Sequence, residues 1–234
     1  MIYNASCLDA DLSKYDVIFA DPPFEIWDKV SERFKDFDLS KKRIVCITNF
    51  QNREYITNVL GTPRIEMIWH FSNGAWVSHN MPQLCHENIL IYGGTNEFYI
   101  GEENTYRESF KKSSIGRWTN GEKIKVKNRD RLQIQSVIYC PKNKKDGYGK
   151  PSKLMRPIVE AVCFNKCKVI DMFGGQGGIL KVLLDYDIDA DSFEIDQKSF
   201  EKLELIYNSS RLFKKPLAEK GKIKDHDKNV NKLL

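Results

Sequence analysis

The stretch Lys168-Val-Ile-Asp-Met-Phe-Gly-Gly-Gln-Gly-Gly178 indicates the fold more directly than any other part of the chain. Its first five residues read as a buried strand, its glycines as a turn, and the residues from about Ile179 to Tyr186 as a helix. A further strand is predicted over Ala190–Ile195, with Glu194 near its end. This strand, turn, helix and strand predict a parallel βαβ unit and hence an α/β fold.

The glycine-rich turn favours a nucleoside-binding role. Glycine lets the backbone approach a ligand closely, and the helix that follows offers free N–H groups. Glu194 lies 23 residues after Asp171, a spacing at which a carboxylate accepts hydrogen bonds from ribose hydroxyls. A dinucleotide pattern would need glycine where Leu180 stands, and the turn lacks the Lys-Ser/Thr of a phosphate-binding loop. An adenosine cofactor without a pyrophosphate fits better, and a glycine-rich turn without function is the alternative.

The second informative stretch is Asp21-Pro-Pro-Phe24, which follows the apolar run Val17–Ala20. Two prolines remove two backbone donors and stop the strand, so a stiff loop is expected at its carboxyl end, where α/β sheets bind ligands. The loop offers unpaired carbonyls, a carboxylate and an aromatic ring, which suit a planar group with an exocyclic amine. The alternative is a plain strand-to-helix turn in which Asp21 caps the next helix.

Apolar runs and helical periodicity give the other predicted elements. The expected strands are Met1–Ala5, Asp16–Ala20, Arg43–Thr48, Ile65–Phe71, Asn88–Tyr92 and Leu132–Cys140. The expected helices are Glu25–Phe37, Asn52–Leu60, one that opens at Lys150, and Lys198–Tyr207. Between residues 95 and about 131 the periodicity fades, and no regular element is predicted there.

Composition places the chain among ordinary globular proteins, with 234 residues, 41% hydrophobic and 29% charged. No apolar run approaches the roughly 20 residues of a membrane-spanning helix, and the first residues do not resemble a signal peptide. The six cysteines form no Cys-x-x-Cys pair, which favours reduced, buried thiols over a zinc site. We therefore expect a cytoplasmic protein that needs no metal ion.

Positive charge is concentrated in two segments. Residues 107–131 hold nine Lys or Arg against three acids, and residues 211–234 hold eight against three. In the first segment aromatic residues are interleaved with the basic ones, a pattern that suits phosphate contacts and base stacking. A disordered insertion is the competing interpretation. The candidate nucleic-acid-binding residues are Arg107, Lys111, Lys112, Arg117, Trp118, Lys123, Lys125 and Lys127.

Taken together, these motifs resemble the DNA amino-methyltransferases that use S-adenosylmethionine, in the motif order of their β group. Asp21-Pro-Pro-Phe24 is similar to the family's D-P-P-Y/F motif, and Asp171-Met-Phe173-Gly-Gly175-Gln-Gly177 is similar to D-P-F-x-G-x-G. Lys150-Pro-Ser-Lys-Leu154 resembles K-P-x-x-L, Phe193-Glu-Ile-Asp196 resembles the strand that delivers the ribose acid, and His86-Glu-Asn-Ile-Leu90 resembles H-E-x-I-L. The resemblance spans roughly residues 1–208.

The resemblance implies a Rossmann-like three-layer sandwich with a seven-stranded mixed sheet and a permuted motif order. It implies a methyltransferase domain over 1–208, a short target-recognition insertion over 94–147 and a basic tail over 209–234. The implied cofactor is S-adenosyl-L-methionine. Its binding residues would be Asp171, Phe173, Gly175, Gly177 and Glu194, with Lys150 and Ser152 near its methionine end.

The implied reaction is site-specific methylation of adenine N6 on a base flipped out of double-stranded DNA. Asp21 and the Pro22 carbonyl would accept the two N6 hydrogens, Pro23 would stiffen the loop, and Phe24 would stack on the base. Adenine is preferred over cytosine N4 because cytosine enzymes of the family more often have serine where Asp21 stands. A homodimer and the restriction enzyme of a restriction-modification pair are candidate partners that the sequence does not identify.

The chain departs from the family pattern at several positions. Ala5-Ser6 stands where Gly-Asp is common, Trp69-His70 where Trp-x-Lys is common, and Gly147-Tyr-Gly149 where H-P-T-Q is usual. These differences keep a second class open, a non-catalytic DNA- or RNA-binding module on the same fold. An enzyme that methylates RNA bases is a third interpretation, and the sequence does not discriminate it.

Overall fold

The computed structural model describes residues 1–75, 80, 82–94, 99–100, 106–112, 118–127, 132–133, 135–142, 149–164 and 166–212. The chain divides into two units: unit 1 comprises residues 1–96 and 135–234, and unit 2 comprises residues 97–134. Among the described residues, no helix is both long and apolar enough to cross a membrane.

Unit 1 is built on an eight-stranded mixed sheet, with strand order β1-β12-β11-β2-β3-β5-β4-β10. All neighbouring strands are parallel except β5, which is antiparallel to both β3 and β4. In this order the strands span Ile2–Tyr3, Asp189–Phe193, Lys168–Asp171, Val17–Ala20, Arg43–Thr48, Leu84–Gly93, Ile65–Ala75 and Val137–Tyr139. The predicted α/β fold and the parallel βαβ unit are therefore confirmed.

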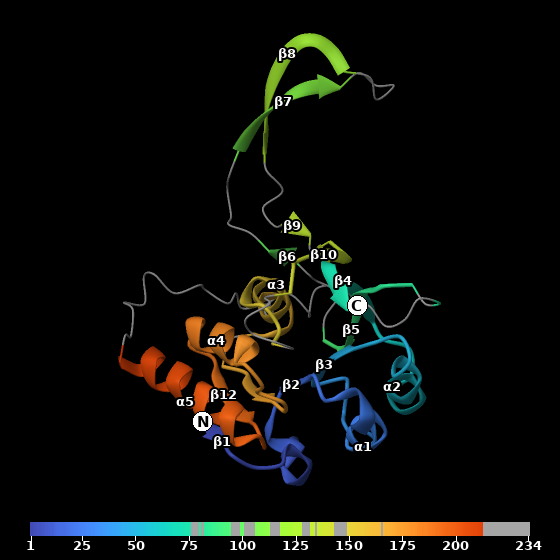
Figure 1. The fold of residues 1–234 in the computed structure, drawn as a ribbon. Helices are drawn as coiled ribbons and strands as arrows, with labels where there is room; N and C mark the ends of the chain where they lie inside the picture. The colour runs from blue at the N-terminus through green and yellow to red at the C-terminus, as the bar shows by residue number, and fades with distance from the viewer. Residues whose placement is uncertain are drawn as a thin grey trace. The chain divides into compact units, whose positions relative to one another are not determined.

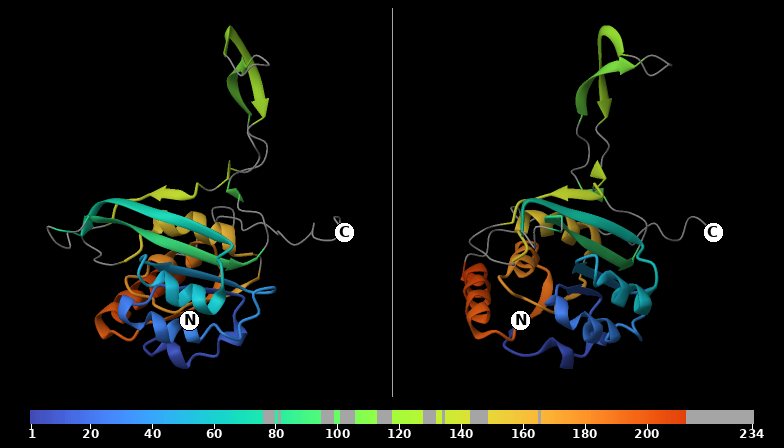
Figure 2. Two further views of the ribbon diagram at one scale, coloured as in Figure 1. Left: turned by 90° about the vertical axis from the view of Figure 1, so that its right-hand side faces the viewer. Right: turned by 45° about the vertical axis from the view of Figure 1, so that its right-hand side comes forward.

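Helices cover the sheet on both faces, with α3, α4 and α5 on one side and α1 and α2 on the other (Figure 1). The turned views in Figure 2 show the same three layers within unit 1. The α-helices span Trp27–Glu32, Arg53–Leu60, Ser152–Val162, Gly178–Asp185 and Gln197–Leu212. Three short 3-10 helices, η1, η2 and η3, span Cys7–Asp9, Leu12–Lys14 and Phe24–Ile26.

The central strands are buried on both faces, as their continuous apolar sequences require. Every residue of β2 and β3 is buried, and Ile18 and Ile44 share one core cluster with Trp27, Phe34 and Ile170. Strands covered by helices on both sides read as unbroken apolar runs rather than alternating ones. The core thus fixes the carboxyl ends of β2 and β11, where the two sequence motifs begin.

Two predictions about unit 1 are corrected by the structure. The sheet has eight strands rather than seven, because β10 pairs with the outer edge of β4. The helix predicted over Glu25–Phe37 is a 3-10 turn followed by α1, which ends at Glu32. Tight turns continue afterwards, with Phe34 N–H donating to Ser31 O, so Val30 and Phe34 still face the core.

Unit 2 contains strands at Tyr99–Ile100, Tyr106–Lys112 and Trp118–Lys127 that the sequence did not predict, whereas the strand predicted over Leu132–Cys140 is two separate strands, Leu132–Gln133 and Val137–Tyr139. β7 (Tyr106–Lys112) pairs with β8 (Trp118–Lys127), and β6 (Tyr99–Ile100) pairs with β9 (Leu132–Gln133). Both pairs are antiparallel. β7 reads YRESFKK, which mixes apolar and charged residues in one alternating set, and in β8 only the last five residues, KIKVK, alternate as a half-buried strand does.

Candidate active site at the carboxyl ends of the central strands

The Asp21–Phe24 loop leaves the sheet at the end of β2, in the centre of unit 1. Pro23 is the residue before η3, and no side chain caps η3 or α1. The alternative in which Asp21 caps the next helix is therefore wrong. The Asn52 side-chain amide donates to the Phe24 carbonyl at 2.8 Å, which ties the loop to the start of α2. The Phe24 ring remains 42% exposed, so its face is open to a ligand.

The Asp21 carboxylate is paired with a cation from a distant part of the chain. Lys150 Nζ lies 2.7 Å from Asp21 Oδ2, and the two side chains are 8% and 15% exposed. Burial raises the pKa of Asp21 to about 6, an effect that the positive charge of Lys150 opposes and the negative charge of Glu87 reinforces. Asp21 is therefore a half-buried hydrogen-bond acceptor whose charge depends on its neighbours.

The glycine loop leaves the adjacent strand at the same edge of the sheet. Met172 N–H donates to the Phe19 carbonyl at 3.0 Å, so the loops after β11 and β2 start side by side. Gly175 and Gly177 have φ values of +48° and +78°, a left-handed conformation that side chains with a Cβ rarely adopt. Gly177 is the residue before α4. The turn therefore presents backbone, without side-chain bulk, at the start of a helix.

Glu194 closes the loop from the neighbouring strand. Its Oε2 accepts the Gly175 N–H at 2.8 Å, and its Oε1 accepts the Asp196 N–H at 2.7 Å. Asp171 lies deeper: it is 1% exposed and accepts the Ser192 hydroxyl at 3.1 Å. Burial raises the pKa of Asp171 to about 7. The two acids thus differ in their exposure to solvent, because Glu194 lies at the surface of the loop and Asp171 lies inside the sheet.

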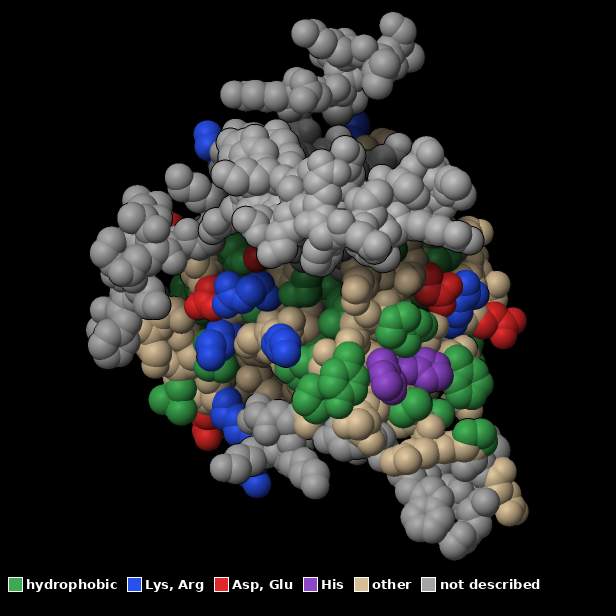
Figure 3. All heavy atoms as spheres, turned by 90° about the horizontal axis from the view of Figure 1, so that it is seen from above, with side chains coloured by type: hydrophobic (Ala, Val, Ile, Leu, Met, Phe, Trp, Pro, Cys, Tyr) green, Lys and Arg blue, Asp and Glu red, His purple; other side chains and the backbone are tan. Residues whose placement is uncertain are grey.

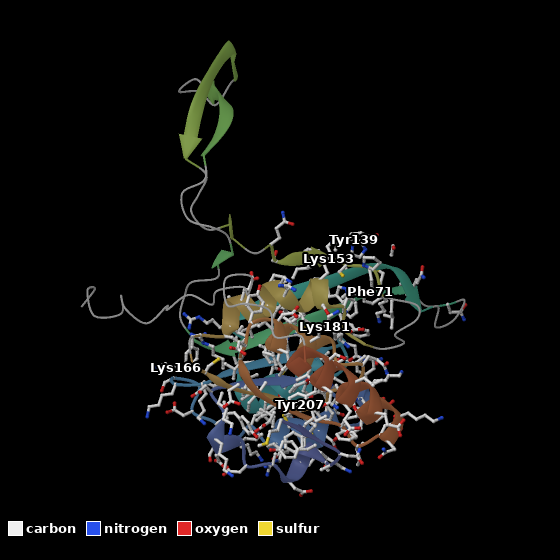
Figure 4. All side chains as sticks on the ribbon, turned by 90° about the vertical axis from the view of Figure 1, so that its left-hand side faces the viewer. Phe71, Tyr139, Lys153, Lys166, Lys181 and Tyr207 are labelled. Carbon is white, nitrogen blue, oxygen red and sulfur yellow. The ribbon has the colours of Figure 1, made fainter. Side chains whose placement is uncertain are left out.

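The structure places the other predicted cofactor residues around the same loops. Phe173 is partly buried against the core cluster, and Ser152 begins α3. The Lys150 backbone carbonyl packs against Gly178, whereas the Lys150 side chain points to Asp21. A pocket of about 440 Å³ adjoins these residues and extends between α4 and α5, lined in part by Ser152, Gly177 and Lys181. Figure 4 shows Lys181 on α4.

Two further charged residues join Asp21 and Lys150: Glu87, which the sequence analysis named only within the His86–Leu90 motif, and Lys142, which it did not name. Glu87 lies in β5 and binds both Lys150 Nζ, at 3.2 Å from Oε2, and Lys142 Nζ, at 2.8 Å from Oε1. Glu87 stands between His86 and Asn88, two residues before the apolar run Ile89–Tyr92 of β5, and its burial calls for a charged partner because an unpaired buried charge would be costly. No comparable sequence signal marks Lys142, which follows β10.

In Trp-x-Lys the lysine falls two residues after the tryptophan, which is Phe71 in this chain, and the Lys142 ammonium lies 4.0 Å from the centre of the Phe71 ring. Trp69 is paired with Glu87 in the sheet register and His70 with His86, so the two pairs project from opposite faces. The His70 ring lies 5.4 Å from the Tyr139 ring. Figure 3 shows histidine side chains among hydrophobic ones on one face of the molecule. The departure from Trp-x-Lys is therefore at Phe71, on the same face as Trp69 and beside Lys142, whereas His70 projects from the opposite face.

The predicted nucleic-acid residues fall in unit 2. The backbones of Arg107, Lys111 and Lys112 belong to β7, and those of Trp118, Lys123, Lys125 and Lys127 belong to β8. Their side chains, all of Arg117 and most of the basic tail lie outside the described residues. In the described ranges, no group of three or more His, Cys, Asp or Glu is arranged to hold a metal ion.

Comparison with solved structures identifies the fold. The chain aligns with M1.HpyAVI in its SAM complex at 17% identity and a TM-score of 0.60, covering 88% of this chain and 98% of that one. It aligns with TTHA0409 from Thermus thermophilus, complexed with S-adenosyl-L-methionine, at 12% identity and a TM-score of 0.59, covering 89% and 95%. The PvuII DNA methyltransferase, which is cytosine-N4-specific, gives 12% identity and a TM-score of 0.56, covering 89% and 91%.

The class defined by these alignments is the Rossmann-like methyltransferase fold. No protein-family model matches the chain, and no curated protein matches it. The assignment of an activity therefore depends on the chemistry of the loops after β2, β11 and β12.

Proposed function

We propose that this protein transfers a methyl group from S-adenosyl-L-methionine to adenine N6 of a base flipped out of double-stranded DNA. The observation that carries the proposal is the position of Asp21. It is a half-buried carboxylate after β2, beside a glycine loop whose residues suit a nucleoside cofactor. An exocyclic amine bound at Asp21 would lie next to a cofactor bound at the glycine loop.

The reaction needs an acceptor for the amine hydrogens and an activated methyl group. Asp21 and the Pro22 carbonyl accept the two N–H bonds, which moves the nitrogen towards sp³ geometry and exposes its lone pair. The sulfonium of the cofactor supplies the activated methyl group. The N–C bond forms as the S–C bond breaks, the electron pair stays on sulfur, and the amine then loses one proton, which Asp21 is placed to accept. The exposed Phe24 ring stacks on the base.

The cofactor is assigned to the loops after β11 and β12. Gly175 and Gly177 allow close approach to the backbone, Phe173 and Asp171 support the loop, and Glu194 accepts the ribose hydroxyls. Ser152 and the Lys150 backbone are proposed to flank the methionine end, where the 149–152 segment meets the start of α4.

Replacing Glu194 with alanine should weaken S-adenosylmethionine binding roughly tenfold to a hundredfold, because hydrogen bonds to a charged acceptor are lost. The bond from Gly175 N–H to Glu194 is lost as well, so the loop loses a restraint. Titration calorimetry measures the affinity. Asp196→Asn, an acidic position two residues later that caps α5, serves as the matched control and should bind normally. An unchanged affinity in Glu194→Ala would remove this residue from the cofactor site.

DNA is the proposed partner because the basic residues of β7 and β8 accompany the methyltransferase fold. We propose that unit 2 reads the target sequence and that residues 1–208 carry the chemistry, with the insertion at 94–147. The basic tail would add phosphate contacts. A non-catalytic module on the same fold would bind nucleic acid but would not bind S-adenosylmethionine, so calorimetry with the cofactor alone separates the two functions.

The choice of adenine depends on Asp21, and one of the similar solved structures is a cytosine-N4-specific enzyme. DNA from cells that express the chain should contain N6-methyladenine at a defined motif, measured by mass spectrometry of nucleosides and by long-read sequencing. DNA from cells that express Asp21→Ala is the control. Finding N4-methylcytosine instead would overturn the choice of base but keep the reaction class. Finding neither, together with methylated RNA, would overturn DNA as the substrate.

A further inference from the structure

Four charged side chains of alternating sign form a continuous series of ion pairs that begins at Asp21. Asp21, Lys150, Glu87 and Lys142 follow one another as acid, base, acid and base, each in contact with the next. They come from four separate segments: the loop after β2, the segment before α3, strand β5 and the segment after β10. The four charges sum to zero.

Lys150 is held on several sides. Its ammonium contacts two carboxylates and lies 5.6 Å from the centre of the Trp69 ring. Glu87 is in turn fixed in the middle of β5, where it is opposite Trp69 in the register with β4. The ion pair between Lys150 and Asp21 is made through Oδ2, and Oδ1 is the oxygen assigned below to another donor.

Stability alone is a poor explanation for this series of ion pairs. Removing charged groups from water costs several kcal/mol for each ion, so a buried ion pair is often no more stabilising than apolar side chains of similar volume. Apolar residues could fill the space beside Trp69 without that cost. The arrangement calls for a role in which the charge of Lys150 itself matters.

We propose that Lys150, fixed by Glu87, is a positioning residue that keeps Asp21 ionised and holds Oδ1 towards the target amine. This inference rests on the proposed methyl transfer to an amine. An ionised Asp21 accepts hydrogen bonds with both oxygens, whereas a protonated carboxyl would offer a donor and compete with the amine. Lys150 thus acts on the reaction through Asp21 and does not contact the reacting atoms.

The charges around Asp21 predict shifts of opposite sign for two substitutions. Lys150 and Lys142 lower the pKa of Asp21, whereas burial, Glu87 and the nearby Asp171 favour its neutral form. Activity of the wild type should therefore fall as the pH drops through about 6. Lys150→Met should move this midpoint up by about one pH unit, and Glu87→Gln should move it down, because each removes one neighbouring charge.

The experiment measures kcat against pH for the wild type, Lys150→Met, Glu87→Gln and Lys150→Arg, with saturating cofactor and DNA. Lys150→Arg keeps the charge and should restore the wild-type midpoint. Lys153→Met is the matched control, because this lysine lies three residues later on α3 and is exposed (Figure 4). The Asp21 carboxyl is also followed by ¹³C NMR, which reports its pKa without requiring turnover.

Opposite shifts of the Asp21 titration in the two variants, matched by the activity profiles, would support the inference. Equal losses at every pH with an unmoved midpoint would mean that Lys150 is only structural and would overturn it. If Lys150→Met does not fold, the inference is tested by Glu87→Gln alone, through the direction in which the midpoint of the Asp21 titration moves. A wild type that shows the NMR shifts but no methyl transfer would contradict the proposed function rather than the influence of Lys150 on Asp21.

Discussion

Replacing Asp21 with alanine is expected to abolish turnover, with a loss of about a thousandfold or more in kcat, while the affinity for S-adenosylmethionine stays within a few-fold. Removal of one charge-stabilising group from an active site typically lowers kcat by about 10²–10³. Asp21 is also proposed to accept the proton released by the amine, so its loss affects two stages of the same transfer. The proposed cofactor contacts lie on the loops after β11 and β12 and on the 149–152 segment, and Asp21 belongs to none of them.

Two further substitutions sharpen the Asp21 experiment. Asp21→Asn keeps an acceptor oxygen but loses the charge and the pairing with Lys150, so intermediate activity is expected. Glu25→Ala removes an exposed acid four residues later and should leave turnover unchanged. Turnover is measured by transfer of a labelled methyl group to DNA. Strong activity in Asp21→Ala would rule out this residue as the amine acceptor.

Gly178→Ala should destabilise the protein and weaken its hold on the cofactor. A Cβ at position 178 would lie 1.8 Å from the Lys150 carbonyl oxygen and 2.9 Å from its carbonyl carbon, so backbone has to move. We expect the free energy of unfolding to fall by about 3 kcal/mol, the upper end for overpacking a well-packed site. The displaced 149–151 segment would carry Lys150 away from Asp21 and open the side of the cofactor loop.

Gly61→Ala is the matched control for this effect. Gly61 follows α2 with a φ of +75° and has no atoms within 4 Å of an added Cβ. Its ψ of −156° belongs to a region that essentially only glycine adopts, so its substitution should cost about 1–3 kcal/mol through backbone strain alone, without changing cofactor affinity. Chemical denaturation and calorimetry measure both quantities. Equal affinity in Gly178→Ala and the wild type would show that the 149–151 segment does not support the cofactor loop.

Local sequence was sufficient to predict the strands that depend on the burial of apolar runs and on the prolines or glycines that end those runs. The run that became β2 is apolar throughout, the runs that became β3 and β11 are apolar between polar end residues, and prolines or glycines follow β2 and β11. The end of the helix after Phe24 was not predicted correctly. Tight turns after Glu32 keep Phe34 buried, as a longer helix would, so the apolar spacing is the same in both cases.

The contacts between charges could not be predicted in the same way. Glu87 and Lys142 are 55 residues apart, and they meet only because β10 joins the edge of β4. β10 lies within the strand predicted over Leu132–Cys140, but nothing in its three residues shows that it pairs with β4. The pairing of Lys150 with Asp21 likewise depends on the packing of Gly178 against the Lys150 carbonyl, which no periodicity reveals.

The position of Lys142 limits how the protein could be re-engineered. This residue follows β10 by three positions, and β10 follows unit 2, yet its ammonium binds Glu87 next to Lys150. A grafted recognition segment must therefore join the chain before Val137, so that β10 and Lys142 are retained. A chimera joined after Lys142 would exchange more than unit 2, because the same cut would remove an ion partner of Glu87.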